Sequence, residues 1–302
     1  MSKPRLFYTD GVIVNRSCLF VTAGFNADRD ADSSMLIGKF GQTWAGHGVP
    51  EDMLVSLTYS AKENRVFALG KNGIVKSVGT VGVPFSLESV RGKFRTDWIA
   101  DAQDRGPLER ITVVGDSIYA CGWAGQIYAL RRGVWSRADD GIDAANFDFL
   151  NIGGFSENNL FAIGLQGIIF HYDGRHWSRV DSPTNQHLYD IALEPGGKVM
   201  IAGAEGVLLS GDSNGFQVLD VPTGMGNLWS VECYAERLFV AHSHNRISCL
   251  SEQTWQPIAI QAGEPVTTYR LSSRDSVLLS IGASTLATLD GEQWTTLQCP
   301  EG

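Results

Sequence analysis

Apolar runs of about five residues recur along the chain, and most of them end at a glycine. The runs occupy residues 118–122, 160–164, 199–203, 238–242 and 277–281. The last four runs follow one another at intervals of 39 residues. An aromatic residue stands thirteen positions after the end of each run, at Trp135, Trp177, Phe216, Trp255 and Trp294. A period of this size, made of strands and turns, predicts small sheets repeated around an axis.

One repeat shows what the unit is. Residues 188–193, 198–202, 206–210 and 216–221 are rich in Val, Ile, Leu and aromatic residues, and turn residues separate them. This pattern predicts four short strands in an antiparallel meander. A single sheet of this kind cannot bury both of its faces, whereas a ring of stacked sheets buries both faces of every sheet.

Each run ends at an anchor residue, and extending the pattern toward the N-terminus gives seven anchors. These are Gly24, Gly70, Gly122, Gly164, Gly203, His242 and Ile281. Glycine at many anchors and again three residues later predicts a two-residue turn, where a positive φ costs glycine little. We therefore expect an all-β fold: a single β-propeller domain over residues 1–302, with seven four-stranded antiparallel blades and six blades as the alternative.

The first two units are longer than the others, which predicts loop insertions at residues 25–34 and around residues 79–94. Residues 5–8 form a spare apolar segment that could add a strand to the C-terminal unit. In these units Trp44 and Trp98 stand further from their anchors than the other repeated aromatics do.

Composition narrows the choice of partner. The net charge of −9 argues against nucleic acid, whose phosphates need a basic surface, and is compatible with a basic protein partner. No apolar signal-peptide core follows Met1, and no apolar run reaches 18 residues, so we expect a cytoplasmic protein without a membrane segment. The five cysteines are odd in number and scattered, which favours free thiols in a reducing compartment.

Two segments carry a family resemblance. His171-Tyr-Asp173-Gly174-Arg-His-Trp177 and Thr288-Leu-Asp290-Gly291-Glu-Gln-Trp294 resemble degenerate Asp-box repeats. Such repeats occur in bacterial propellers of the sialidase-repeat and WD-repeat-like superfamily. The resemblance implies a propeller fold but no particular activity, because that superfamily includes hydrolases, assembly factors and binding proteins.

Strand alternation indicates which face carries function. The loops after the second and fourth strands of each unit emerge on one face, and they hold most of the residues that do not repeat. Acidic side chains and non-repeating aromatics on that face predict a surface that binds a protein, since Trp and Tyr are common in binding hot spots. The candidate partner-binding residues are Asp28, Asp30, Asp32, Asp101, Asp104, Trp123, Asp139, Asp140, Asp143, Gln166, Tyr189, Glu205, Trp229 and His244.

The chemistry of an enzyme or metal site is mostly missing from the sequence. Residues 28–32 alternate carboxylates like a calcium loop, but Ser33 and Lys39 replace the required Gly and Glu. His242 and His244 stand at repeat positions, which explains them better than a metal does. Glu109, Arg110 and Arg270 are too few for a sialidase-type arginine cluster. We therefore expect no cofactor, no metal and no catalytic residue.

Three functions remain. The first is a non-catalytic propeller that binds a basic protein through its acidic face, such as an immunity protein that inhibits a bacterial toxin. The second is a glycan-binding or glycoside-hydrolysing propeller that uses Trp123, Tyr189 and Trp229 for stacking. The third is an assembly factor or scaffold of a larger complex.

Overall fold

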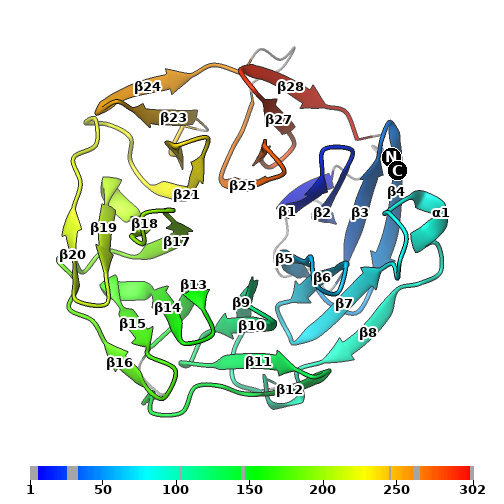
Figure 1. Ribbon diagram of the computed structural model, residues 1–302, viewed down its shortest axis with the longest axis horizontal. Helices are drawn as coiled ribbons and strands as arrows, with labels where there is room; N and C mark the ends of the chain where they lie inside the picture. The colour runs from blue at the N-terminus through cyan, green and yellow to red at the C-terminus, as the bar shows by residue number, and fades with distance from the viewer. Residues whose placement is uncertain are drawn as a thin grey trace.

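Seven four-stranded antiparallel sheets surround a common axis (Figure 1). The computed structural model describes residues 6–25, 33–102, 104–143, 147–244, 246–260 and 266–299. Each sheet consists of four consecutive strands, with the first strand near the axis and the fourth at the rim. The predicted seven-bladed β-propeller is confirmed, and the alternative of six blades is wrong.

The blades, numbered 1 to 7 along the chain, have the following strands. Blade 1 contains β1 (Leu6–Asn15), β2 (Cys18–Phe25), β3 (Ser34–Phe40) and β4 (Thr43–Val49). Blade 2 contains β5 (Leu54–Ser60), β6 (Arg65–Gly70), β7 (Ile74–Gly79) and β8 (Arg95–Trp98). Blade 3 contains β9 (Leu108–Val114), β10 (Ser117–Gly122), β11 (Ile127–Arg131) and β12 (Val134–Arg137). Blade 4 contains β13 (Phe149–Ser156), β14 (Asn159–Gly164), β15 (Ile169–Tyr172) and β16 (Trp177–Arg179).

The remaining blades follow the same order. Blade 5 contains β17 (Leu188–Leu193), β18 (Val199–Gly203), β19 (Leu208–Asp212) and β20 (Gly215–Val218). Blade 6 contains β21 (Leu228–Tyr234), β22 (Arg237–His242), β23 (Arg246–Ser251) and β24 (Thr254–Ile258). Blade 7 contains β25 (Arg270–Arg274), β26 (Val277–Ile281), β27 (Leu286–Asp290) and β28 (Gln293–Leu297). The α-helix α1 (Leu87–Val90) lies in the predicted insertion between β7 and β8.

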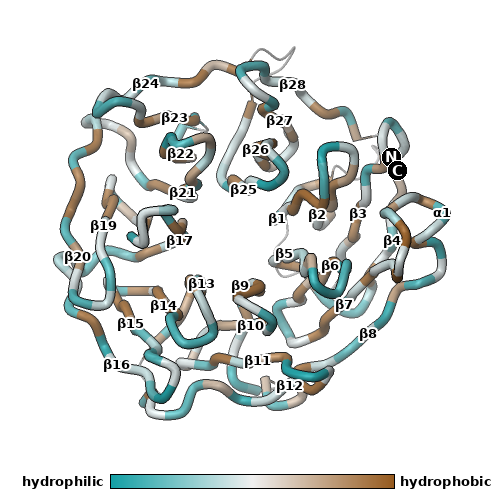
Figure 2. Tube along the Cα trace, in the orientation of Figure 1, coloured by the Kyte–Doolittle hydropathy of each residue, from teal (hydrophilic) through white to brown (hydrophobic). Residues whose placement is uncertain are grey.

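Hydrophobic side chains fill the space between neighbouring blades. The described core divides into seven clusters, one at each blade boundary, and each cluster draws residues from both blades. Hydrophilic residues are concentrated in the turns between strands (Figure 2). A blade therefore has no core of its own, and its apolar surface is buried only against its neighbours.

The repeated aromatics of the fourth strands pack onto the preceding blade. The Trp177 indole N–H donates to the Ala138 carbonyl at 2.7 Å, and the Trp255 indole N–H donates to the Asp220 carbonyl at 3.1 Å. Blade 2 differs from what the spacing predicts. There Phe94 packs into the cluster between blades 1 and 2, while Trp98 is 52% exposed. Trp98 is therefore a surface residue and not the repeated packing aromatic.

The turns after the second strands are longer than predicted. Four residues separate β14 from β15 and β18 from β19, instead of the two expected for a tight hairpin. The left-handed backbone conformation occurs at Gln166 (φ 57°) as well as at Gly167 (φ 72°). The anchor Gly164 is required by close approach, because a Cβ there would lie 1.9 Å from the Asp148 carbonyl oxygen.

The ring closes without an exchanged strand. Leu6–Asn15 is the first strand of blade 1 and pairs with β2, so the expectation that residues 5–8 add to the C-terminal blade is wrong. The Tyr8 N–H donates to the Ala283 carbonyl at 3.0 Å, which links blade 1 to blade 7. The same two blades are also joined at the opposite face of the propeller, where the Arg16 N–H donates to Asp275 Oδ2 at 3.0 Å. Hydrophobic packing between blades 7 and 1 completes the closure.

A polar ring surrounds the axis, formed by one residue at the same position in each first strand. In order from blade 1 to blade 7 these residues are Asp10, Ser56, Arg110, Asn151, Asp190, Ser230 and Arg270. We call this set the axial girdle. The two aspartates, the two serines and the asparagine of the girdle are buried.

The axial girdle joins three blades at a time. Asp10 Oδ2 accepts hydrogen bonds from the Ser56 hydroxyl and the Leu57 N–H, and the Ser56 hydroxyl accepts from the Ile111 N–H. Blades 5 to 7 repeat this arrangement. There Asp190 accepts from Ser230 and Val231, and Ser230 accepts from Leu271.

Arginine completes both halves of the girdle. Arg110 lies 3.4 Å from Asp10 and 3.8 Å from Asp190. Because blades 1, 3 and 5 are not neighbours, these ion pairs reach across the axis. Arg270 lies 3.5 Å from Asp190. Burial disfavours the charged guanidinium of Arg110, but Asp10 and Asp190 outweigh it and raise the pKa of Arg110.

The girdle predicts a large stability effect at Asp190. Replacing Asp190 with alanine removes the acceptor of three buried donors, on Asn151, Ser230 and Val231. It also leaves Arg110 and Arg270 without their shared carboxylate. We expect Asp190→Ala to lower the free energy of unfolding by about 3 to 5 kcal/mol. Urea denaturation measures the change. The exposed Asp181→Ala is the control and should stay within about 0.5 kcal/mol of the parent.

Glu232 predicts a second effect, on the pH dependence of stability. Burial and the nearby Asp190 raise the pKa of Glu232 from 4.5 to about 8, although Ser273 and Arg110 oppose the shift. Between these values the folded chain holds a proton that the unfolded chain releases. The free energy of unfolding should therefore fall as pH rises through this window, by up to about 1.4 kcal/mol per pH unit.

Glu232→Gln should remove this loss, because glutamine does not ionise. Denaturation midpoints at pH 5 and pH 8 measure the effect, and the exposed Glu236→Gln is the matched control. An unchanged pH dependence in Glu232→Gln would contradict the assignment.

Candidate protein-binding face

The face at which each first strand begins carries two sets of loops. One set connects the second strand of a blade to its third, and the other connects a fourth strand to the next blade. We call this the upper face, and the opposite face the lower face. All the candidate partner-binding residues that the structure describes belong to loops of the upper face or to the starts of first strands.

Charge is distributed unequally between the two faces. In the described parts of the upper-face loops, Lys71 and Arg105 are the only lysine and arginine. The acidic residues in these loops are Glu51, Asp52, Asp101, Asp104, Asp139, Asp140, Asp143, Asp148, Asp181, Glu205 and Asp220. Acidic residues therefore far outnumber basic ones in the described upper-face loops.

Acidic residues also occur in the lower-face turns, so the expectation that acid is concentrated on one side is wrong as stated. The lower face differs because basic residues accompany its acids, as in the 2.6 Å ion pair between Lys62 and Asp116. Arg132, Arg175 and Lys198 also lie in lower-face turns. The upper face is acidic because lysine and arginine are scarce there.

A buried carboxylate organises the acidic loops around blade 3. Asp139 is 3% exposed and lies in the loop after β12. Its Oδ2 accepts from Arg105 Nη2 at 3.1 Å, and its Oδ1 accepts from Arg137 Nε at 3.0 Å. Arg105 belongs to the loop between blades 2 and 3, so Asp139 ties two neighbouring loops together. Arg105 also donates to the Tyr128 hydroxyl, which donates to the Asp101 carbonyl.

This burial corrects the prediction for Asp139. Its carboxylate is buried and accepts hydrogen bonds from two arginines, so it cannot contact a partner directly. Asp101, Asp104, Asp140 and Asp143 are exposed. We call these four residues the acidic cluster. Asp139 therefore positions the loops that carry the acidic cluster.

Two exposed tryptophans belong to the same loops or lie beside them. Trp123 is 41% exposed in the turn between β10 and β11, and its indole N–H donates to Glu109 Oε1 at 2.9 Å. Trp98, at the end of β8, immediately precedes the loop that holds Asp101 and Asp104. The sequence analysis did not include Trp98 among the candidate partner-binding residues. Its shifted spacing was the available signal.

The other candidate residues lie over blades 4 to 6. Tyr189 and Trp229 stack with ring centroids 5.0 Å apart and an interplanar angle of 29°. Both rings are half-buried, and both residues stand at β-bulges where first strands begin. Burial and the negative charge of nearby Glu205 raise the pKa of Tyr189. The hypothesis of glycan stacking on these rings stays a prediction.

Three residues fix the turns that present the remaining candidates. The Gln166 N–H donates to His187 Nδ1, and the Glu205 N–H donates to Asn227 Oδ1, both at 3.1 Å. Asp148 serves the Ala124 N–H in the same way. Each acceptor belongs to the next blade, so neighbouring blades are joined at the upper face. His244 occupies a turn of this kind with a left-handed backbone (φ 69°).

Asp28, Asp30 and Asp32 lie outside the described residues. The described residues include no group of three His, Cys, Asp or Glu side chains suited to hold a metal. His242 is 6% exposed, and its two ring nitrogens lie within hydrogen-bond distance of the Ser243 carbonyl and the Ser248 hydroxyl. The structure thus accounts for His242 as a buried residue of the repeat.

Comparison with known proteins places this geometry in context. The chain is 28% identical over 271 residues to the Immune protein Tsi7 of Pseudomonas aeruginosa, covering 84% of each chain. No protein-family model matches the sequence. Among solved structures, the WD40 β-propeller domain of Doa1 aligns with a TM-score of 0.69 at 14% identity, covering 92% of this chain and 90% of the other.

A second solved structure, YCF48 bound to D1 peptide, aligns with a TM-score of 0.69 at 15% identity, covering 94% of this chain and 92% of the other. These likenesses support the WD40-like propeller fold, while the narrower Asp-box resemblance stays a prediction. No helix in the described residues is long and apolar enough to span a membrane.

The contacts of Asp139 predict a local effect on the loops. Asp139→Ala should leave Arg105 and Arg137 without their carboxylate and loosen residues 99–107 and 138–143 while the blades stay folded. Hydrogen exchange read by mass spectrometry should show at least tenfold faster exchange in these two segments. The exposed Asp140→Ala is the matched control. Unchanged exchange in Asp139→Ala would contradict the role assigned to this carboxylate.

Proposed function

We propose that the chain is an immunity protein that neutralises a toxin by binding it through the upper face. The observation that carries this proposal is the likeness to the Immune protein Tsi7, which extends over 84% of both chains. A propeller suits the role because its blades hold many independent loops on one rigid face. The contact surface is expected to centre on the acidic cluster and Trp123.

We infer that the toxin surface is basic. All four members of the acidic cluster are aspartates. Arg105, which follows Asp104 in the sequence, is paired with Asp139. Electrostatic complementarity of this kind speeds association and selects partners, and it is screened by salt. Trp123 adds an exposed aromatic anchor next to these charges.

The first experiment tests the immunity function itself. Affinity purification of the tagged chain from its native host should recover one stoichiometric partner that arrests growth when it is expressed alone. Coexpression of the chain should restore growth. A partner that is harmless alone and belongs to a larger complex would favour the assembly-factor hypothesis instead.

The second experiment tests the binding face. Reversing the acidic cluster to lysine should weaken binding of the recovered partner by at least tenfold, mainly through slower association, because the attraction becomes a repulsion. Surface plasmon resonance at two salt concentrations measures both rates. The salt dependence of the association rate should become weaker or change sign.

A matched reversal on the lower face controls for net charge. It replaces the exposed residues Glu63, Glu194, Glu236 and Glu252 with lysine. This variant carries the same change in net charge and should bind within about threefold of the parent. Equal losses in both variants would show that total charge matters and would overturn the choice of the upper face.

A further inference from the structure

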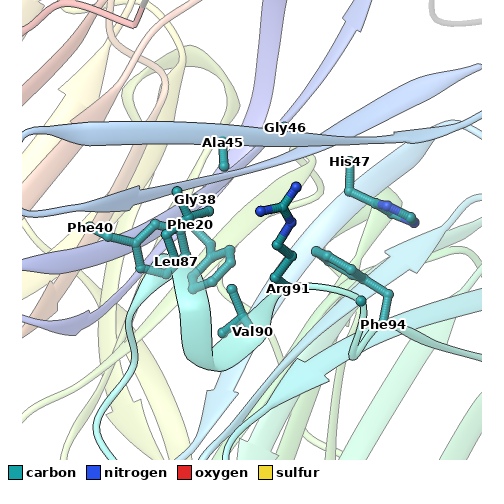
Figure 3. Close-up of a pocket in the computed structure, with 11 residues that line it drawn as sticks. Phe20, Gly38, Phe40, Ala45, Gly46, His47, Leu87, Val90, Arg91 and Phe94 are labelled. Carbon is teal, nitrogen blue, oxygen red and sulfur yellow. The ribbon is translucent and has the colours of Figure 1, made fainter.

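A groove lies at the rim of the propeller, between blade 1 and the insertion of blade 2. It has a volume of about 610 Å³. The strands β3 and β4 form its floor, and α1 with the segment that follows it forms the opposite wall (Figure 3). The lining of the groove includes none of the residues proposed to bind a toxin.

The wall formed by the insertion is held in place before any ligand binds. Ser86 and Ser89 exchange hydrogen bonds between side chain and backbone, at 2.8 and 3.1 Å, and so cap the start of α1. Phe85 and Val90 are buried in the cluster between blades 1 and 2. These anchors leave Leu87 38% exposed at the groove. A preformed apolar groove of this volume is typical of small-molecule sites.

The groove is lined mainly by aromatic and aliphatic side chains. His47 and Phe94 stack in parallel, with centroids 4.0 Å apart and an interplanar angle of 5°. Phe20 and Phe40 meet edge to face at 5.6 Å. Gly38 lets these two phenylalanines approach β3, because a Cβ at this position would lie 2.8 Å from both rings. The flat surfaces suit an aryl or alkyl group.

One positively charged side chain, that of Arg91, lies against this apolar surface. The Arg91 side chain extends into the groove between the Phe20–Phe40 and His47–Phe94 pairs (Figure 3). Its guanidinium makes no hydrogen bond or ion pair with the described residues. Burial and the charge of Lys76 lower the pKa of His47, against the opposing effect of Glu51, so this imidazole is neutral at pH 7. Lys76 itself is paired with Glu51 at 3.6 Å.

We propose that this groove binds an apolar monocarboxylate, with the carboxylate on Arg91 and the apolar body between the aromatic pairs. A guanidinium presents a planar fork of donors that matches a carboxylate. Arg91 is the one arginine among the residues that line the groove, and the net charge of the chain is −9. This favours a monoanion over a dianionic phosphate, whose second charge would find no partner. The site is separate from the proposed toxin-binding face and does not depend on it.

Calorimetric titration with 4-phenylbutanoate tests the proposal, with the neutral 4-phenylbutanamide as its matched probe. The carboxylate should bind saturably and at least tenfold more tightly than the amide. Arg91→Gln should weaken binding of the carboxylate about tenfold or more and leave binding of the amide within about twofold. Arg95→Gln, at an exposed position of neighbouring β8, should change neither.

A second variant tests the location without touching the charge. Ala45→Phe should fill the groove from β4 and abolish binding of both probes, and an unchanged melting temperature would show that the variant is folded. If Ala45→Phe proves unstable, Leu87→Ala on the opposite wall takes its place as the test. This variant should weaken binding of both probes about equally. Absence of saturable binding to the parent, or equal binding of acid and amide, would overturn the proposal.

Discussion

Hydrogen bonding around the axis is the constraint on which the propeller depends. Hydrophobic packing joins each blade to the next, but it is non-directional and would tolerate some sliding of one sheet over another. The axial girdle adds direction, because Asp10 and Asp190 each accept from a side chain and a backbone N–H of the following blade. Arg110 then connects the two halves across the axis. The relative rotation of the blades is fixed where they come closest together.

Polar side chains also join neighbouring blades at the upper face. Asp148, His187 and Asn227 hold the turns of the preceding blade by accepting backbone N–H groups. Asp139 does the equivalent for longer loops by binding two arginines. Polar residues that look available from the sequence thus fall into two groups. Some of them shape the loops, and only the others are left to contact a partner.

The sequence predicted the blade number and the strand order because every blade repeats the same apolar runs and turn residues. Phe94 and Trp98 show where this fails. The insertion of residues 79–94 shifts the spacing, and spacing alone cannot tell a buried aromatic from an exposed one. Asp139 fails for a related reason, since its partner Arg105 is 34 residues away and belongs to another loop. The girdle has a signal, a polar residue in each first strand, but the residue type changes from one blade to the next.

Closure of the ring by four consecutive strands in every blade has an evolutionary meaning. Among the described residues no strand is shared between the first and last blades, so each blade corresponds to one uninterrupted stretch of coding sequence. Duplication or deletion of such a stretch would add or remove a complete structural unit and leave no unmatched strand behind. The girdle opposes such changes of ring size. Its two Asp-Ser-Arg triplets lie four blades apart, and the Arg110 guanidinium can reach both Asp10 and Asp190 across the axis only at one circumference of the ring.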